Sequence, residues 1–224
     1  MPDNPKDLGD FVEALATRYK GRVHGYEIWN EQNLYYENGG RVVPEDAGHY
    51  VELLIEAYKR IKAVDPNAYV LAGAPTSTGT NDPTIAIDDI SFLRLMYSYK
   101  DGIIRDYFDV QAVHPGGAAN PPDTLWPDQP SQVEGWNDHP TFYFRHIENV
   151  RKVMEEFGLA DHQIWITEFG WATANNTPGY EFGNLISLEQ QGQYILDALQ
   201  RTRNHYPWVG AIFVWNLNFS ISLG

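Results

Sequence analysis

Helical and strand-like hydrophobic patterns alternate along the 224-residue chain, and this alternation constrains the fold more than any other feature. Apolar residues at helical spacing predict helices over about 7–19, 44–65, 91–99, 142–157 and 188–206. The short apolar run after each helix predicts a strand, over 25–31, 68–75, 108–115, 163–170 and 209–218. Strands of this kind, separated by helices, are typical of a parallel sheet buried on both faces. We therefore expect an α/β fold and a single domain over residues 1–224.

Chemically active side chains stand where these strands end. The strand ends read Asn30-Glu31, Pro75-Thr76, His114-Pro115, Glu168-Phe169 and Trp215-Asn216. Because the carboxyl ends of parallel strands share one edge of the sheet, these side chains are expected on one rim. A carboxylate that ends an apolar strand is partly desolvated and can hold a proton near neutral pH, which suits Glu31 to general acid catalysis. Glu168 would be a second, facing carboxylate, and glycosidic bond cleavage uses such a pair.

Three motifs carry a resemblance to a known group of enzymes. The segments YEIWNEQN, IWITEFGW and IFVWNLN look like the strand-four, strand-seven and strand-eight motifs of clan A retaining glycoside hydrolases, nearest to families 39 and 5. The resemblance implies that Glu31 is the acid/base and Glu168 the nucleophile. It also implies that Asn30 contacts the sugar 2-hydroxyl and that Trp215 forms the floor under the reacting sugar.

The resemblance also sets the expected architecture, a (β/α)8 barrel of the TIM type. It runs from the helix before strand four to strand eight, so the first three strand–helix units have no counterpart in the 224 residues. Those units supply an arginine beside the nucleophile in the clan. A second departure follows the sixth strand, where the clan has a tyrosine two residues after the histidine and this chain has Pro115 and Gly116 after His114.

Composition excludes several other classes of function. The formal net charge is −14 without a Lys/Arg cluster, which opposes binding to nucleic acid or to an anionic membrane surface. There is no cysteine, the histidines lack ligand spacing, and we expect neither a metal nor a cofactor. LAGAPTSTG lacks the Gly-x-Gly-x-x-Gly spacing of a nucleotide site. No apolar run approaches the length of a membrane span, and no cationic, apolar leader follows Met1, so the compartment is left open.

Other polar and aromatic residues have both structural and functional interpretations. Glu27 is expected in a buried salt bridge, for example with Arg22, and would share a side with Glu31 if the strand stays regular. His114 fits substrate binding and a structural hydrogen bond equally well.

The tryptophans divide in the same way. Trp29 and Trp165 lie within strands and are expected in the core. Trp171 and Trp215, with Asn216, are expected at the sugar. Two further tryptophans, Trp126 and Trp136, lie in the long irregular segment 116–140, where packing and stacking are equally expected.

Two functional hypotheses remain open at this stage. The first is a retaining β-glycosidase acting on a carbohydrate substrate through Glu31 and Glu168. The second is a barrel fragment that binds carbohydrate weakly or not at all and persists by pairing with another chain. In either case the first and last strands would be sheet edges with unpaired backbone groups, which favours a homo-oligomer.

Overall fold

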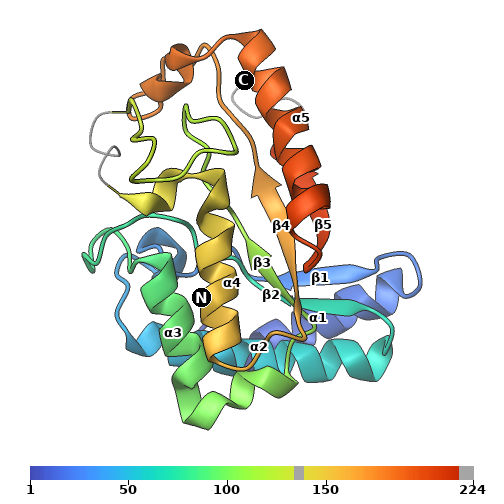
Figure 1. Cartoon of the computed structure of the whole chain (residues 1–224). Coiled ribbons are helices and arrows are strands. Elements are labelled where there is room, and N and C mark those ends of the chain that lie inside the picture. The colour runs from blue at the N-terminus through green and yellow to red at the C-terminus, as the bar shows by residue number, and fades with distance from the viewer. Residues whose placement is uncertain (134–138, 217–224) are drawn as a thin grey trace. The chain divides into compact units, whose positions relative to one another are not determined.

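The computed structural model describes residues 1–133 and 139–216, and it contains the expected alternation of helices and strands (Figure 1). The helices are α1 (Pro5–Tyr19), α2 (Glu45–Val64), α3 (Asp89–Ser98), α4 (Ile147–Glu156) and α5 (Leu188–His205). The strands are β1 (Gly25–Ile28), β2 (Tyr69–Ala72), β3 (Val110–Val113), β4 (Gln163–Phe169) and β5 (Val209–Val214). Short 3₁₀ segments occur at Tyr36–Asn38, Tyr99–Asp106, Pro140–Phe142, Phe144–His146 and Glu181–Leu185.

The strands form one sheet in the order β1-β2-β3-β4-β5. β1 pairs with β2 in parallel, with Gly25 opposite Tyr69, and β2 pairs with β3 in parallel, with Leu71 opposite Val110. Sequential strands that lie side by side in parallel are connected through helices. The fold is therefore α/β with a five-stranded parallel sheet, which is compatible with part of a TIM-type barrel.

The fourth helix begins later than its hydrophobic pattern predicts. Two 3₁₀ segments occupy 140–146, and between them Tyr143 adopts an extended conformation, with φ −127° and ψ 143°. This turn buries Tyr143 completely and lets its hydroxyl donate a hydrogen bond to the carbonyl oxygen of Gln129, at 2.8 Å. Burial of the tyrosine ring and this hydrogen bond outweigh the local preference for a helix.

Contacts within the chain define two compact units, residues 1–112 with 150–164 and residues 113–149 with 165–224. In the first unit α2 packs against α1 and α3 (Figure 1). Its inward face supplies large buried side chains, among them Leu53, Leu54 and Ile61. On the outer side Arg60 of α2 bonds to Glu13 of α1 at 2.5 Å and to Glu56 at 2.8 Å.

The second unit is built around aromatic side chains. The rings of Phe144, Phe169 and Trp171 lie within 6.2 Å of one another, centroid to centroid, and all three residues are buried. α5 begins with a capping box, in which Ser187 and Gln190 satisfy each other's backbone N–H groups. None of the helices in the described ranges is long and apolar enough to span a membrane.

Candidate active site

The chain turns sharply where β1 ends, at the Asn30-Glu31 pair. Trp29 has φ 67° and Glu31 has φ 45°, both in the left-handed region that residues with side chains rarely adopt. β1 therefore stops at Ile28, and the regular alternation that would place Glu27 and Glu31 on one side does not continue. Glu31 is half-buried and Asn30 is exposed.

Buried hydrogen bonds hold this turn against the end of β2. The hydroxyl of Tyr50, on α2, donates to the carbonyl oxygen of Ile28 at 2.9 Å and accepts from the N–H of Gly73 at 2.6 Å. The N–H of Glu31 donates to the carbonyl oxygen of Ala74 at 3.1 Å. A Cβ on Gly73 would lie 2.5 Å from that same Ile28 oxygen, so only glycine permits this approach.

The two amides after Glu31 fasten the next part of the loop. Gln32 and Asn33 are completely buried. Gln32 Nε2 donates to the Gly73 carbonyl oxygen at 2.8 Å, and Asn33 Nδ2 donates to the carbonyl oxygens of Thr76 and Ile87 at 2.8 and 2.7 Å. Sequence analysis did not single out Gln32, Asn33 or Tyr50. The only local signal was a pair of amides between a candidate acid and an apolar residue.

Glu27 lies within β1, and its Oε1 accepts a hydrogen bond from the N–H of Ala74 at 3.2 Å. The expected partner Arg22 is exposed, and its guanidinium lies 5.8 Å from the centroid of the Tyr19 ring. Glu27 thus helps to join the ends of β1 and β2 through a backbone hydrogen bond, where the sequence had predicted a buried salt bridge with Arg22.

In the second unit, Glu168 stands near the end of β4 with His114 beside it. The side chain of Glu168 is 32% exposed and that of His114 is 7% exposed. His114 Nε2 lies 3.1 Å from the Thr167 hydroxyl oxygen and 4.0 Å from Glu168 Oε1. A histidine held at this distance can limit the movement of the carboxylate and, when protonated, attract it.

The residue that follows β5 is hydrogen-bonded to the residue that follows Glu168. The N–H of Trp215 donates to the carbonyl oxygen of Phe169 at 2.8 Å, and a Cβ on Gly170 would come within 2.6 Å of the Trp215 carbonyl oxygen. The side chain of Trp215 is 53% exposed. Asn216 Oδ1 is buried and has no hydrogen-bond partner among the described residues.

Trp171 was expected to face a sugar, but its indole is packed inside the second unit. It is only 4% exposed, and its Nε1 donates to the carbonyl oxygen of Asn120 at 2.8 Å. Gly117 makes room for the ring, because a Cβ there would lie 2.6 Å from an indole atom. Trp171 therefore anchors the segment after β3 to the segment after β4 within this unit.

Of the two loop tryptophans, Trp126 is half-buried and Trp136 lies outside the described residues. Trp165, in β4, and Trp29, which directly follows β1, were both expected in the core, and both are half-buried. In the described ranges, no cluster of His, Asp and Glu side chains is arranged to hold a metal ion.

The predicted site residues are thus divided between the units. Asn30 and Glu31 belong to the first, whereas His114, Glu168, Trp171, Trp215 and Asn216 belong to the second. Within the second unit, the structure brings His114 to Glu168 and attaches the Trp215 backbone to the end of β4.

Comparison with solved structures shows a common fold with glycoside hydrolases. A family 39 glycoside hydrolase from Bacteroides cellulosilyticus superposes on 96% of this chain with a TM-score of 0.56 and 21% identity. A family 44 xyloglucanase from Paenibacillus polymyxa matches 94% of the chain with a TM-score of 0.59 and 17% identity. A glucosidase from Croceicoccus marinus matches 95% of it with a TM-score of 0.56 and 16% identity.

The fold of this chain is similar to part of the fold of these enzymes. This chain spans 38% of the length of the family 39 enzyme and of the glucosidase, and 47% of the length of the xyloglucanase. No family model and no curated protein sequence matches it. The likeness therefore lies in the arrangement of the backbone, and the residues above carry the argument for chemistry.

Proposed function

We propose that the chain is a retaining glycoside hydrolase that cleaves β-glycosidic bonds, with Glu31 as acid/base and Glu168 as nucleophile. One observation carries the proposal: in a glycoside hydrolase fold, Asn-Glu follows one strand and Thr-Glu-Phe-Gly ends another, as in the clan A motifs. The backbone N–H of Glu31 is bonded to Ala74, and the Glu168 carboxylate lies 4.0 Å from His114 Nε2.

In the first half of the reaction, the Glu168 carboxylate attacks the anomeric carbon while the Glu31 carboxyl group gives its proton to the leaving oxygen. The bond to the leaving group breaks, and a covalent glycosyl ester forms on Glu168. In the second half, Glu31 removes a proton from water, and the resulting nucleophile displaces Glu168 from the sugar. Two inversions return the original anomeric configuration, and no cofactor is needed.

Neighbouring residues would support these steps. His114 lies close enough to Glu168 to restrain it. It would thereby take the place of the tyrosine that the clan has two residues after the histidine, where this chain has Gly116. The exposed indole of Trp215 would lie under the sugar ring, and Asn216, the next residue, would contact the sugar. On the other unit, Asn30 would bind the 2-hydroxyl. Trp171 would act indirectly, by fixing the segment that follows Glu168.

Substitution of each glutamate by glutamine tests the division of roles. Glu168→Gln should abolish turnover on every substrate, because the nucleophile is lost. Glu31→Gln should slow substrates whose leaving group needs a proton and spare aryl glycosides with acidic leaving groups. Azide should rescue Glu31→Gln and yield a glycosyl azide of retained configuration.

A matched control is Glu52→Gln, which changes a carboxylate on α2 that pairs with Lys100. Its kinetics should equal those of the unaltered protein. Equal losses in Glu31→Gln for good and poor leaving groups, without azide rescue, would contradict the proposal. An experimental complex with bound sugar should place the two carboxyl groups about 5 to 5.5 Å apart, whereas about 6.5 to 9.5 Å would indicate inversion.

A second candidate is carbohydrate binding with little or no hydrolysis. The observation that favours it is that the chain spans less than half of each related enzyme. Saccharide binding that persists while no product forms, even with activated aryl glycosides, would support this candidate over the first.

A further inference from the structure

Each candidate catalytic glutamate is followed, on its own loop, by a pair of neighbouring aromatic side chains with exposed surface. In loop 29–44 the pair is Tyr35 and Tyr36, which are 39% and 57% exposed. Their rings meet edge to face, with centroids 5.3 Å apart and an angle of 83° between planes. Tyr35 comes four residues after Glu31.

Backbone and side-chain hydrogen bonds hold this first pair in place. The N–H of Tyr35 donates to the carbonyl oxygen of Ile85, and its own carbonyl oxygen accepts from the N–H of Gly40. Asn38 Nδ2 donates to the carbonyl oxygens of Gln32 and Leu34 at 2.5 and 2.9 Å. The rings are therefore displayed by an ordered loop, which lowers the entropy cost of binding.

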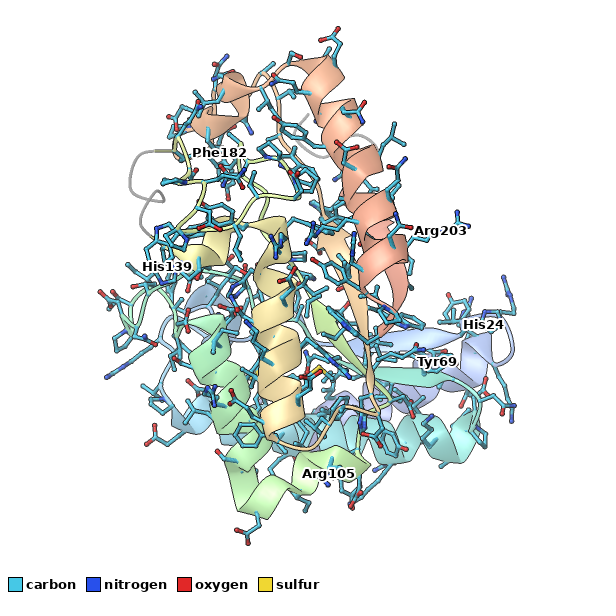
Figure 2. All side chains as sticks on the ribbon, in the orientation of Figure 1. His24, Tyr69, Arg105, His139, Phe182 and Arg203 are labelled. Atoms are coloured by element: carbon cyan, nitrogen blue, oxygen red, sulfur yellow. The ribbon has the colours of Figure 1, made fainter. Side chains whose placement is uncertain are left out.

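The second pair is Tyr180 and Phe182, in loop 170–187 after Glu168 (Figure 2, where Phe182 is labelled). Tyr180 is 55% exposed, and its ring centroid lies 6.0 Å from that of Phe182. The N–H of Gly183 donates to the Tyr180 carbonyl oxygen. Gly183 lies so close to Ala172 that a Cβ would approach Ala172 atoms at 3.1 Å, which presses the end of this loop against its beginning.

Further contacts give loop 170–187 a definite shape. Asn184 Nδ2 donates to the carbonyl oxygen of Asn175 at 2.8 Å, and the Glu181 carboxylate accepts from the N–H of Gly179 at 2.8 Å. The second aromatic pair, like the first, is thus supported by bonds within its own unit. Neither pair depends on how the two units are placed.

Charge narrows the choice of ligand. Loop 29–44 holds two glutamates and one arginine, a net charge of −1, and loop 170–187 holds one glutamate, also −1. Glu37 follows Tyr36 directly, and Glu181 follows Tyr180 directly. Together with the −14 of the whole chain, these carboxylates repel acidic glycans and leave neutral ones favoured.

We propose that the Tyr35–Tyr36 and Tyr180–Phe182 pairs are two sugar-binding platforms, and that the substrate is a neutral polysaccharide extending beyond the sugars at the cleaved bond. An aromatic face stacks on the C–H face of a pyranose ring and buries apolar area at small entropic cost. This inference rests on the proposed function for where cleavage occurs, but the binding it claims does not require hydrolysis.

Binding can be measured without turnover by affinity electrophoresis of Glu168→Gln in gels that contain xyloglucan, hydroxyethylcellulose, arabinoxylan or polygalacturonate. At least one neutral polysaccharide should retard the protein, and polygalacturonate should not. Adding Tyr36→Ala or Tyr180→Ala should weaken that binding about three- to tenfold each, the range expected for one lost aromatic contact. Tyr36→Phe and Tyr180→Phe keep the ring and should bind as well as the parent. Phe11→Ala, which removes a 61% exposed ring from α1, is the matched control and should have no effect.

Kinetic measurements on variants that keep both Glu31 and Glu168 separate the two proposals. Tyr36→Ala and Tyr180→Ala should lower kcat/KM on the polysaccharide about three- to tenfold and leave kcat/KM on an aryl monosaccharide within about twofold. Equal losses of kcat/KM on the polysaccharide and on the aryl monosaccharide would refute the platforms but leave the proposed glycosidase activity standing. Absence of retardation by every neutral polysaccharide, or retardation unchanged in both alanine variants, would also overturn them. Binding that responds to the variants without any hydrolysis would uphold the platforms and refute the proposed enzyme.

Discussion

The most direct test of the structure around Glu31 is Tyr50→Phe, which removes a single oxygen atom. Tyr50 is completely buried, and burial raises the pKa of its hydroxyl, so the group stays protonated and able to donate at neutral pH. That hydroxyl serves two backbone groups at once, the Ile28 carbonyl oxygen at 2.9 Å and the Gly73 N–H at 2.6 Å. Phenylalanine would leave both without this partner.

The magnitude follows from these two groups. A buried polar group that loses its partner costs about 1–3 kcal/mol, so two of them predict a loss of about 2–6 kcal/mol in the free energy of unfolding. Domains are stabilised by only about 5–15 kcal/mol, so this loss is large. For a protein of this size it corresponds to a fall in melting temperature of at least about 4 °C. Turnover should fall as well, because Ile28 and Gly73 support the turn that carries Glu31.

Urea denaturation followed by tryptophan fluorescence would give the change, and Tyr97→Phe provides a graded control. Tyr97 is equally buried, but its hydroxyl donates to one side-chain atom, Gln111 Oε1, at 2.8 Å. Because one acceptor loses its partner, Tyr97→Phe should lower the free energy of unfolding by about 1–3 kcal/mol. A loss in Tyr50→Phe below about 0.5 kcal/mol, or no larger than in Tyr97→Phe, would refute the assignment of Tyr50 as the bridge between β1 and β2.

Three further changes test other parts of the fold. Burial opposes ionisation of Glu148, but hydrogen bonds from Arg145 and Tyr206 outweigh the effect of burial and lower the pKa of this carboxyl. The ionised carboxylate therefore stabilises the fold above about pH 4.3, and this stabilisation is lost as the pH falls through the lowered pKa. Glu148→Gln should therefore be less stable than the parent at pH 7 and lose less stability on acidification to about pH 3, as urea titrations would show; parallel losses would contradict this. Gly73→Ala should destabilise the protein by about 1–3 kcal/mol, because the added Cβ would meet two backbone oxygens at 2.5 and 3.0 Å, whereas Gly192→Ala, at an exposed position of α5, should stabilise it by about 0.5–1 kcal/mol. A higher melting temperature for Gly73→Ala than for Gly192→Ala would contradict both predictions. β5 stands last in the sheet and Phe213 is 50% exposed, so we expect self-association at micromolar concentration that Phe213→Lys weakens; sedimentation velocity showing only monomer for the parent would rule this out.

Patterns within short windows of sequence predicted the elements and their order. α2 follows the helical spacing between Pro44 and Pro66, and α5 follows its pattern from residue 188 to 205. The periods of 3.6 and 2 arise from backbone geometry and from one-sided burial, so each can be detected without knowing the partner surface. The two candidate glutamates were also found locally, because each lies in a motif at the end of an apolar run.

The residues that support those glutamates were not predictable in this way. Tyr50 looks in the sequence like any apolar position of an amphipathic helix, yet it joins backbone groups 22 and 23 residues away. Trp171 was expected beside a ligand because it follows a strand, and only the structure shows its indole bonded to the backbone 51 residues earlier.

Sequence alone thus determined the alternation of helices and strands, the acidic surface and the two carboxylates as candidates for chemistry. The tertiary structure decided where strands stop, which aromatic rings are buried and which are exposed. The physical reason is the separation along the chain of the residues that interact. A hydrophobic repeat shows which face of one element is buried, and it can be detected within a short window of sequence. The left-handed backbone at Trp29 and Glu31, in contrast, occurs in a turn whose hydrogen bonds reach residues more than 40 positions away. Such bonds form only when the packed elements bring those distant groups together.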